Sequence, residues 1–404
     1  MNKVFIGDYC EVIAGRDKPE HFSINKSSKN KIPVYANGID NEGLVGYTDH
    51  PAITQEAVTV SARGSIGTPF YRNKPYVPII RLISIIPDNK YLDCLYLYYL
   101  LKNSNISGTG SVQAQLTVPM VKQTMINIIK DINVQKSISQ VLSTIDNKIA
   151  NNDKIFTEFE SLARTIYDYW FVQFDFPDEN GRPYKSSGGK MVWNERLQRE
   201  IPDGWRVGCI ADITANVTDG EHGTILNENH SGYYLLSCKN IIGGRLCYDE
   251  SARQVSLKSF EKMRKRTELA EGDVLVSSVG TIGEACVMTA DCDHVEFQRS
   301  VAILKPDYSK ISSEWLYETM LSMKPIMQRN AHGAIQQCIF ISDIKNLFVV
   351  IPPSQIIEIY TDKVQSLLKL KIKKEEENQK LASLRDFLLP LLMNGQVSFK
   401  SDSI

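Results

Sequence analysis

The chain is 404 residues long with 43% hydrophobic and 23% charged residues, a composition typical of soluble globular proteins with two or three domains. Its formal net charge of -1 excludes a uniformly basic nucleic-acid binder but leaves room for a local basic face. The sequence contains no membrane-spanning apolar stretch and no N-terminal signal-peptide pattern. We therefore expect a cytoplasmic protein without membrane contact.

An internal repeat is the main signal along the chain. VTVSARGSIGTP at 58–69 matches VLVSSVGTIGEA at 274–285, which aligns Gly64 with Gly280. Further matches follow in the same order: the strand ends Pro87-Asp88 and Pro306-Asp307, the runs CLYLYYLLK and WLYETMLSMK, and the loops GSVQAQLTVPMVK and GAIQQCIFISDIK. Collinear matches with a slowly drifting offset indicate a duplicated domain.

Each copy is rich in strand-like sequence. VTVSA and IIRLISII belong to the first copy, and YYLLSC, DVLVSS and SVAILK belong to the second. One helix is expected near 91–102 and its counterpart near 312–323. The predicted organisation is a domain at 1–132, a helix at 133–176, a linker at 177–204, a domain at 205–352, and a helix with the C-terminal segment at 353–394. The linker is rich in glycine and proline, which indicates a connector, while Trp193 and Leu197 suggest that it docks on the protein.

A long helical stretch ends each copy. Apolar residues recur from about 133 to 168 at steps of mostly three and four, which predicts a helix roughly 54 Å long, too long for one small domain. The second begins after Pro352-Pro353 and should end near Pro390 or Gly395. We expect the helices to bury their seams against each other, with Asn152, Lys374 and Asn378 as polar positions that fix the register. The alternative is that each helix packs on its own domain. The predicted seam residues are Ile138, Ile145, Phe159, Leu162, Val364, Leu367, Leu381 and Leu384.

Motifs for catalysis and metal binding are missing from the sequence. The glycine turns lack the GxxxxGK[ST] and GxGxxG spacings, so they do not support a nucleotide site. Eight cysteines form no CxxC pair, which predicts reduced, mostly buried thiols and neither zinc nor disulfides. His222 and His332 lie beside glycine in loops, where local hydrogen bonding is favoured over catalysis. We predict no catalytic residue and no metal site; solvation explains the acidic clusters, which are Asp175, Asp178, Glu179, Glu375, Glu376 and Glu377.

The duplicated loops carry side chains that suit DNA. Glutamine pairs with adenine in a bidentate way, and the Gly-x-x-Gln loops contain Ser111, Gln113, Gln115, Gln336 and Gln337. Donors that suit phosphate contacts are Arg72, Lys74, Lys239, Asn240, Gln298, Arg299 and the run EKMRKRTE, with Lys262, Arg264, Lys265 and Arg266. Solvation is the alternative for any single glutamine, but recurrence in both copies favours a shared role. The candidate set also includes Arg63, Gly64, Ser65, Ser278, Gly280, Thr281 and His332.

Over essentially its whole length the chain resembles the specificity subunit of a type I restriction-modification system. The most specific features are the duplication, TIYDYWFVQFDFP at 165–177, and IPPSQ with SLRDFLLPLLMNGQV near the end. The resemblance implies an α+β fold: two similar target-recognition domains, each followed by a long α-helix, with the helices pairing as an antiparallel coiled coil. It implies a non-catalytic subunit in which each domain reads one half of an asymmetric bipartite duplex site, while the helix pair sets the spacer and docks methyltransferase subunits.

The partners implied by this resemblance are double-stranded DNA, two methyltransferase (modification) subunits and, through the complex, restriction/translocase subunits. No cofactor is implied for this chain, and S-adenosylmethionine is expected in the methyltransferase partner. Two departures from the pattern stand out. IPDGW at 201–205 has no counterpart before MNKVFIGDY, so we expect a shorter first strand in the first domain, and Arg63 is replaced by Val279 in the second turn.

Two other functions stay open at this stage. A nuclease or methyltransferase with its own site would need a carboxylate cluster or an NPPY-like loop, and the sequence offers neither. An interaction scaffold would use the helices while its domains bind no nucleic acid.

Overall fold

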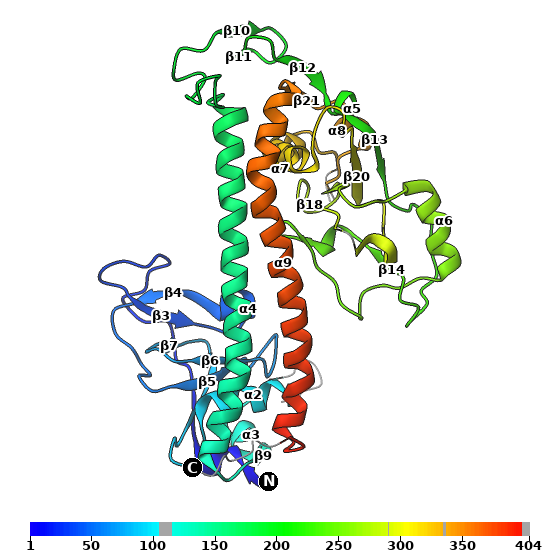
Figure 1. The fold of residues 1–404 in the computed structure, drawn as a ribbon. Coiled ribbons are helices and arrows are strands. Elements are labelled where there is room, and N and C mark those ends of the chain that lie inside the picture. The colour runs from blue at the N-terminus through cyan, green and yellow to red at the C-terminus, as the bar shows by residue number, and fades with distance from the viewer. Residues whose placement is uncertain (105–114, 290, 334–336, 398–404) are drawn as a thin grey trace, which may run out of the picture. The chain divides into compact units, whose positions relative to one another are not determined.

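A computed structural model describes residues 1–104, 115–289, 291–333 and 337–397. Three candidate residues, Ser111, Gln113 and Gln336, lie outside the described residues. The chain forms two compact units, one made of Met1–Lys154 with Lys374–Ile404 and the other of Ile155–Lys373. Each unit contains one copy of the repeat and one part of each long helix (Figure 1).

The first unit is built on a four-stranded antiparallel sheet of order β2-β8-β5-β6. Val58, Val60, Ile83 and Ile85 are buried because they lie on the two central strands, which accounts for the continuous apolar runs in the sequence. The helix α2 (Cys94–Lys102) contacts this sheet, and Asp93 caps its first turn by accepting from the Tyr96 amide. The strands are β2 (Cys10–Ala14), β5 (Ala57–Val60), β6 (Pro69–Arg72) and β8 (Ile83–Pro87).

Smaller elements complete the first unit. The strands β1 (Asn2–Phe5) and β9 (Met125–Ile128) form an antiparallel pair. In the sequence, α1 (Ile6–Tyr9) follows β1 and α3 (Val118–Gln123) precedes β9. A second sheet of order β4-β3-β7 contains β3 (Ile32–Tyr35), β4 (Leu44–Thr48), which follows the 3-10 turn η1 (Asp40–Gly43), and β7 (Val77–Pro78).

The second unit repeats this plan, so the predicted duplication is confirmed. Its four-stranded sheet has the equivalent order β13-β20-β17-β18, formed by β13 (Thr214–Asp219), β17 (Val274–Ser277), β18 (Ala285–Val287) and β20 (Val301–Pro306). The helix α7 (Ser313–Arg329) takes the place of α2, and the antiparallel pair β12 (Arg206–Cys209) and β21 (Phe348–Ile351) takes the place of β1 and β9. The short helices α5 (Ile210–Ile213) and α8 (Ile341–Lys345) correspond to α1 and α3.

The remaining elements of the second unit lie around this framework. β14 (Tyr234–Leu236) pairs in parallel with β19 (Val295–Phe297), as β3 pairs with β7 in the first unit. The other elements are η3 (Cys238–Asn240), β15 (Ile241–Ile242), β16 (Arg245–Leu246), α6 (Leu257–Thr267) and η4 (Asp291–His294).

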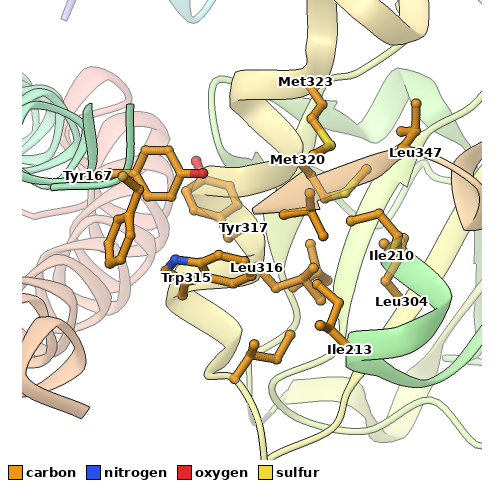
Figure 2. Packing of buried hydrophobic residues seen from close by; sticks show 14 of the residues in the cluster. Tyr167, Ile210, Ile213, Leu304, Trp315, Leu316, Tyr317, Met320, Met323 and Leu347 are labelled. Carbon is orange, nitrogen blue, oxygen red and sulfur yellow. The ribbon is translucent and has the colours of Figure 1, made fainter. Parts of the chain in front are cut away.

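The core of the second unit joins α7 to the sheet and to the first long helix. Figure 2 shows Trp315, Tyr317 and Met320 of α7 between Tyr167 on one side and apolar residues such as Ile210 on the other. The Tyr167 hydroxyl lies 3.0 Å from Thr319 Oγ1, which satisfies both buried groups. Full burial of a side chain such as Met320 contributes about 1.5–3 kcal/mol, so this cluster anchors the long helix to its domain.

The linker between the copies is an ordered hairpin. β10 (Met191–Asn194) pairs with β11 (Arg199–Pro202) in antiparallel fashion. Leu197 packs against the core of the second unit, as the sequence suggested, whereas Trp193 is 52% exposed. The connector is therefore docked through Leu197 together with Tyr184, Met191 and Ile201, and not through the tryptophan.

The two long helices pair, as predicted. α4 (Ile132–Tyr167) continues as a π-helical turn at Asp168–Val172, and α9 spans Ser354–Met393. In the first unit the beginning of α4 shares a core with the end of α9, and in the second unit the end of α4 shares a core with the beginning of α9, which makes the pair antiparallel. Both cores also contain domain residues, so each helix packs on its domain as well. α9 passes Pro390 and ends just before Gly395, whose φ is 66°.

Two predictions about these elements are wrong. Leu162 and Leu384 are 46% and 47% exposed, so they do not lie on the buried seam; Phe156 and Ala163 occupy the inward face instead. Among the other predicted seam residues, Ile138, Ile145 and Val364 are buried, while Phe159, Leu367 and Leu381 are half-buried. The strand β1 is not shorter than β12, because both have four residues and each pairs along its full length with β9 or β21.

A polar layer interrupts the helix pair in the first unit. Asn152 is completely buried, and its Nδ2 donates to Glu377 Oε2 at 3.0 Å and to Asn378 Oδ1 at 2.9 Å. Asn378 Nδ2 in turn donates to Asp153 Oδ1 at 3.1 Å. Asn152 Oδ1 is buried without a hydrogen-bond partner among the described residues. Such a layer costs stability and specifies which residues face each other, the role predicted for Asn152 and Asn378.

Candidate nucleic-acid interface

The strands β5 and β17 end in turns of the same geometry. The Gly67 amide donates to the Ser61 carbonyl at 2.9 Å, and the Gly283 amide donates to the Ser277 carbonyl at 2.9 Å. All four glycines of the turns have positive φ: 72° and 78° at Gly64 and Gly67, 74° and 87° at Gly280 and Gly283. Glycine adopts this conformation at little cost, so the shared spacing in the sequence reflects the turn itself.

The segments that follow the two Gly-x-x-Gln sequences are bonded to these turns in the same way in both units. The Leu116 amide donates to the Ala62 carbonyl at 3.0 Å, and the Ile339 amide donates to the Ser278 carbonyl at 2.9 Å. In the first unit Arg63 Nη2 donates to Gln115 Oε1 at 2.9 Å. The structure therefore brings Arg63 and Gln115 together from segments that are far apart in the sequence.

In the second unit His332 and Cys338, which flank the Gly-x-x-Gln sequence, pair through their backbones. The His332 amide donates to the Cys338 carbonyl at 2.7 Å, and the Cys338 amide donates back to the His332 carbonyl at 2.8 Å. The Gly280 amide donates to the carbonyl of the exposed Gln337 at 3.2 Å. The His332 ring stacks on Phe340, and its Nε2 lies 3.1 Å from Asp343 Oδ2, so this histidine makes the local contacts that the sequence favoured.

Arg72 does not lie where a phosphate could reach it. It is 4% exposed, its Nε donates to Thr59 Oγ1 at 3.1 Å and its Nη1 donates to Glu42 Oε2 at 2.9 Å. The guanidinium also stacks on the ring of Tyr35 at 3.7 Å, and burial lowers its pKa. Arg72 therefore stabilises the first unit, and of the two donors expected on this segment only Lys74 is exposed.

Arg264 plays a similar structural role in the second unit. Its Nε donates to Glu296 Oε1 at 2.6 Å, and its Nη2 donates to the Val295 carbonyl at 2.8 Å. Glu296 is fully buried, and this burial raises the pKa of its carboxyl group even though Arg264 lies beside it. Within the run EKMRKRTE, Lys262 and Lys265 are the lysines exposed on the surface.

Several polar residues predicted to contact DNA instead make hydrogen bonds within the loops of the second unit. Ser278 is 3% exposed, and its Oγ donates to the Arg299 carbonyl at 3.3 Å. Asn240 Nδ2 donates to the Cys247 carbonyl at 2.9 Å, which fixes η3. Arg299, Thr281 and Lys239 are exposed, Gln298 is half-buried, and Ser65 is half-buried in the first unit.

A turn that the sequence pattern did not predict lies immediately before β8. IIRLISII looks like one continuous strand, yet β8 begins only at Ile83, because Ile80 and Arg81 have positive φ values of 51° and 62°. The Ile80 amide donates to the Arg16 carbonyl at 2.9 Å, as the Arg299 amide donates to the Glu221 carbonyl at 3.0 Å. Alignment of Gln298-Arg299 with Ile79-Ile80 in the repeat would have indicated this turn, because Gln298 and Arg299 were already candidate DNA-binding residues.

Possible metal ligands and membrane-spanning helices can be assessed for the described residues. Within 1–104, 115–289, 291–333 and 337–397, no three His, Cys, Asp or Glu side chains gather as a metal site, and no helix is long and apolar enough to span a membrane. All eight cysteines lie among the described residues, and none of them forms a disulfide. Only Cys10, Cys94 and Cys286 are buried, so the expectation of mostly buried thiols is wrong.

Comparison with known proteins identifies the family. Residues 1–161 match the model of the type I restriction modification DNA specificity domain. The chain is 25% identical over 353 residues to the type I restriction enzyme MjaIX specificity subunit of Methanocaldococcus jannaschii, covering 84% of this chain and 77% of that protein. It is 31% identical over 119 residues to a Mycoplasma pneumoniae protein named as the C-terminus of a type I specificity subunit, covering 29% of this chain and 80% of that protein.

A solved structure has the same fold. The type I restriction-modification S subunit from M. genitalium aligns with a TM-score of 0.61 and 16% identity, covering 97% of this chain and 95% of that chain. The chain therefore belongs to the family of DNA specificity subunits of type I restriction-modification systems, which are non-catalytic, carry no catalytic cofactor themselves and act within a DNA-binding complex.

Proposed function

We propose that each unit reads one half of an asymmetric bipartite DNA site and that the helix pair sets the distance between the halves. The observation that carries this proposal is the equivalent placement of loops on the two sheets. In each unit a glycine turn, a residue that follows the Gly-x-x-Gln segment in the chain (Leu116 or Ile339), and the turn before β8 or β20 adjoin at one end of the four-stranded sheet. The side chains at equivalent positions differ, Arg63 against Val279 for example, which favours two different half-sites.

The proposed contacts follow from exposure. In the first unit Arg63 suits a phosphate and Gln115 suits a base edge, while Gly64 and Ser65 allow close approach of the DNA backbone. The exposed Lys74 follows the end of β6 that pairs with Ala57, away from the glycine turn, so it is left out of the proposed set. A Cβ at Gly64 or Gly280 would meet nothing within 4 Å, so these turns leave open space beside them. The proposed residues of the second unit are Lys239, Gly280, Thr281, Gln298, Arg299, His332 and Gln337. Arg72, Asn240 and Ser278 are assigned structural roles instead.

The helix pair is proposed as the docking surface for two methyltransferase subunits. Large apolar side chains lie exposed on both helices, including Phe387 at 65% and Leu162 at 46%, and exposed apolar surface of this kind suits a protein partner. S-adenosylmethionine would be bound by those methyltransferase subunits, and restriction/translocase subunits would join through the complex. A cytoplasmic location follows from the proposed duplex DNA target.

Binding to duplex DNA at several salt concentrations tests the proposal. The full chain, combined with its modification subunits, should bind a duplex carrying its site, and a protein with six to ten phosphate contacts should lose about 10³–10⁵ in affinity between 50 and 200 mM salt. Arg63→Ala should weaken binding, whereas Lys90→Ala, which alters an exposed lysine beyond the opposite end of β8, should not. Absence of salt-dependent duplex binding by the wild-type complex would leave the scaffold function as the better account.

A further inference from the structure

The turn at Ile79–Leu82 combines backbone strain with exposure. Ile80 and Arg81 both occupy the left-handed region, with φ of 51° and 62°, which is rare for a β-branched residue. The Ile80 side chain is 63% exposed, so it contributes little to any core. Strain of this kind persists only where the surroundings impose it, and it is concentrated at functional sites.

Hydrogen bonds from neighbouring loops impose this conformation. The Ile80 amide donates to the Arg16 carbonyl at 2.9 Å, and the Arg81 amide donates to the Gly15 carbonyl at 3.2 Å. Asn37 Nδ2 donates to the Ile80 carbonyl at 2.7 Å. The turn is therefore fixed on both sides, and its two side chains are presented to solvent by a rigid backbone.

The same asparagine joins this turn to the proposed interface. Asn37 Oδ1 accepts from the Ala62 amide at 2.8 Å, immediately before Arg63 in the glycine turn. The side chains of Ile80, Arg81 and Arg63 consequently belong to adjoining loops at one end of the sheet. Two exposed arginines together with one exposed apolar residue match the chemistry of a duplex, which offers charged phosphates and apolar base surfaces such as the thymine methyl group.

The second unit arranges the equivalent turn differently. There the Ser278 amide donates directly to the Ser300 carbonyl at 2.9 Å, without a bridging side chain like that of Asn37. Arg299, which corresponds to Ile80, is not among the residues with positive φ. The bridging asparagine and the isoleucine with positive φ are thus specific to the first unit, as expected for a feature that distinguishes one half-site from the other.

From these contacts we infer that the Ile80–Arg81 turn is a specificity-determining element of the first unit, with Ile80 packing on an apolar base surface and Arg81 binding a phosphate. This inference rests on the proposed function, since it assigns new residues to the same DNA interface. A purely structural turn would favour glycine at both positions, because glycine adopts positive φ without strain and Ile80 has little buried surface to lose.

The test uses glycine, which preserves the turn. Ile80→Gly and Arg81→Gly are prepared in the full chain and combined with its modification subunits, with Lys90→Ala as the matched surface control. The site is first identified by mapping methylated positions, and affinity is then measured for the cognate duplex and for duplexes with single base-pair changes in each half. Thermal unfolding is recorded in parallel and should show equal or higher Tm for the glycine variants.

Ile80→Gly should reduce discrimination at one base pair of one half-site by about 5- to 150-fold, the equivalent of about 1–3 kcal/mol, and leave the other half-site unchanged. Arg81→Gly should weaken binding to all sequences alike and lower the salt slope by about one. If both variants bind and discriminate within twofold of wild type while Arg63→Ala weakens binding, the inference is overturned and the proposed function stands. Failure of the wild-type complex to bind duplex DNA overturns both.

Discussion

Lengthening the helix pair tests whether it sets the spacing. The change is an insertion of about three heptads, roughly 21 residues, into both helices, following the existing seam pattern. The insertion points are after Lys154 in α4 and before Lys374 in α9, where each helix passes from one unit to the other. Placing the insertions there leaves the packing within each unit intact.

The expected change in spacing follows from helix geometry. At 1.5 Å per residue the pair grows by roughly 32 Å, which corresponds to about nine base pairs at 3.4 Å each. The seam of a helix pair turns about the pair's axis by about 20° per heptad, so three added heptads rotate one unit relative to the other by about -60°. The added base pairs, about nine, fall short of a full turn of the DNA by roughly 40°, so the half-site rotates by a similar amount in the same direction. Both units therefore still face the duplex. An insertion of about two heptads lengthens the pair by only about six base pairs. The second unit would then face away from its half-site on the DNA, so this variant should bind poorly.

Mapping of methylated sites in cells that carry the complete system provides the assay. With the longer insertion, both half-sites should keep their base sequences and be separated by about nine additional base pairs. An unchanged spacer, or altered half-sites, would refute the role of the helices in setting the distance.

Two stability predictions follow from buried polar groups. Burial raises the pKa of Glu318 to about 7 although Arg164 Nη1 lies 3.5 Å away, so the carboxylate is disfavoured in the folded state and its contribution to stability falls as the pH rises from about 4.5 to about 7. Relative to wild type, Glu318→Gln should gain up to about 3 kcal/mol in denaturant unfolding across that window, and a pH-independent difference would contradict the assignment. Replacing Asn152 and Asn378 together by leucine removes the buried Asn152 Oδ1 that has no hydrogen-bond partner among the described residues, and should raise the free energy of unfolding by about 1 kcal/mol or more. Without the polar layer the register of the helix pair is less strictly specified, so sites with a wider range of spacer lengths should be methylated. A loss of more than about 1 kcal/mol in the same denaturant experiment would contradict the stability cost assigned to the polar layer.

The sequence was sufficient for features that repeat or that have a strong local pattern. The aligned glycines Gly64, Gly67, Gly280 and Gly283 predicted two equal turns, because positive φ restricts the residue type at those positions. The apolar periodicity predicted both long helices to within a few residues, since the seam must repeat about every turn to be buried.

Features that depend on tertiary contacts could not be predicted in the same way. Leu162 and Leu384 fit the seam spacing, but small differences in helix rotation place Ala163 and Phe156 inward instead. The sequence does not distinguish Arg72 from an arginine that binds a DNA phosphate, because Glu42, Thr59 and Tyr35 surround its guanidinium only in the folded chain. The Ile80 turn reads as a strand because the bonds that impose it come from distant loops.

Exchange of the first domain is the most direct test of the central claim that each unit reads one half of the site. Residues 1–130 are replaced by the corresponding domain of another specificity subunit, which keeps α4 from Ile132 onward. Methylated sites are then mapped in cells carrying the hybrid with its partner subunits. We expect one half of the recognised sequence to change, while the other half and the spacer stay the same. A change in both halves, or in neither, would contradict it.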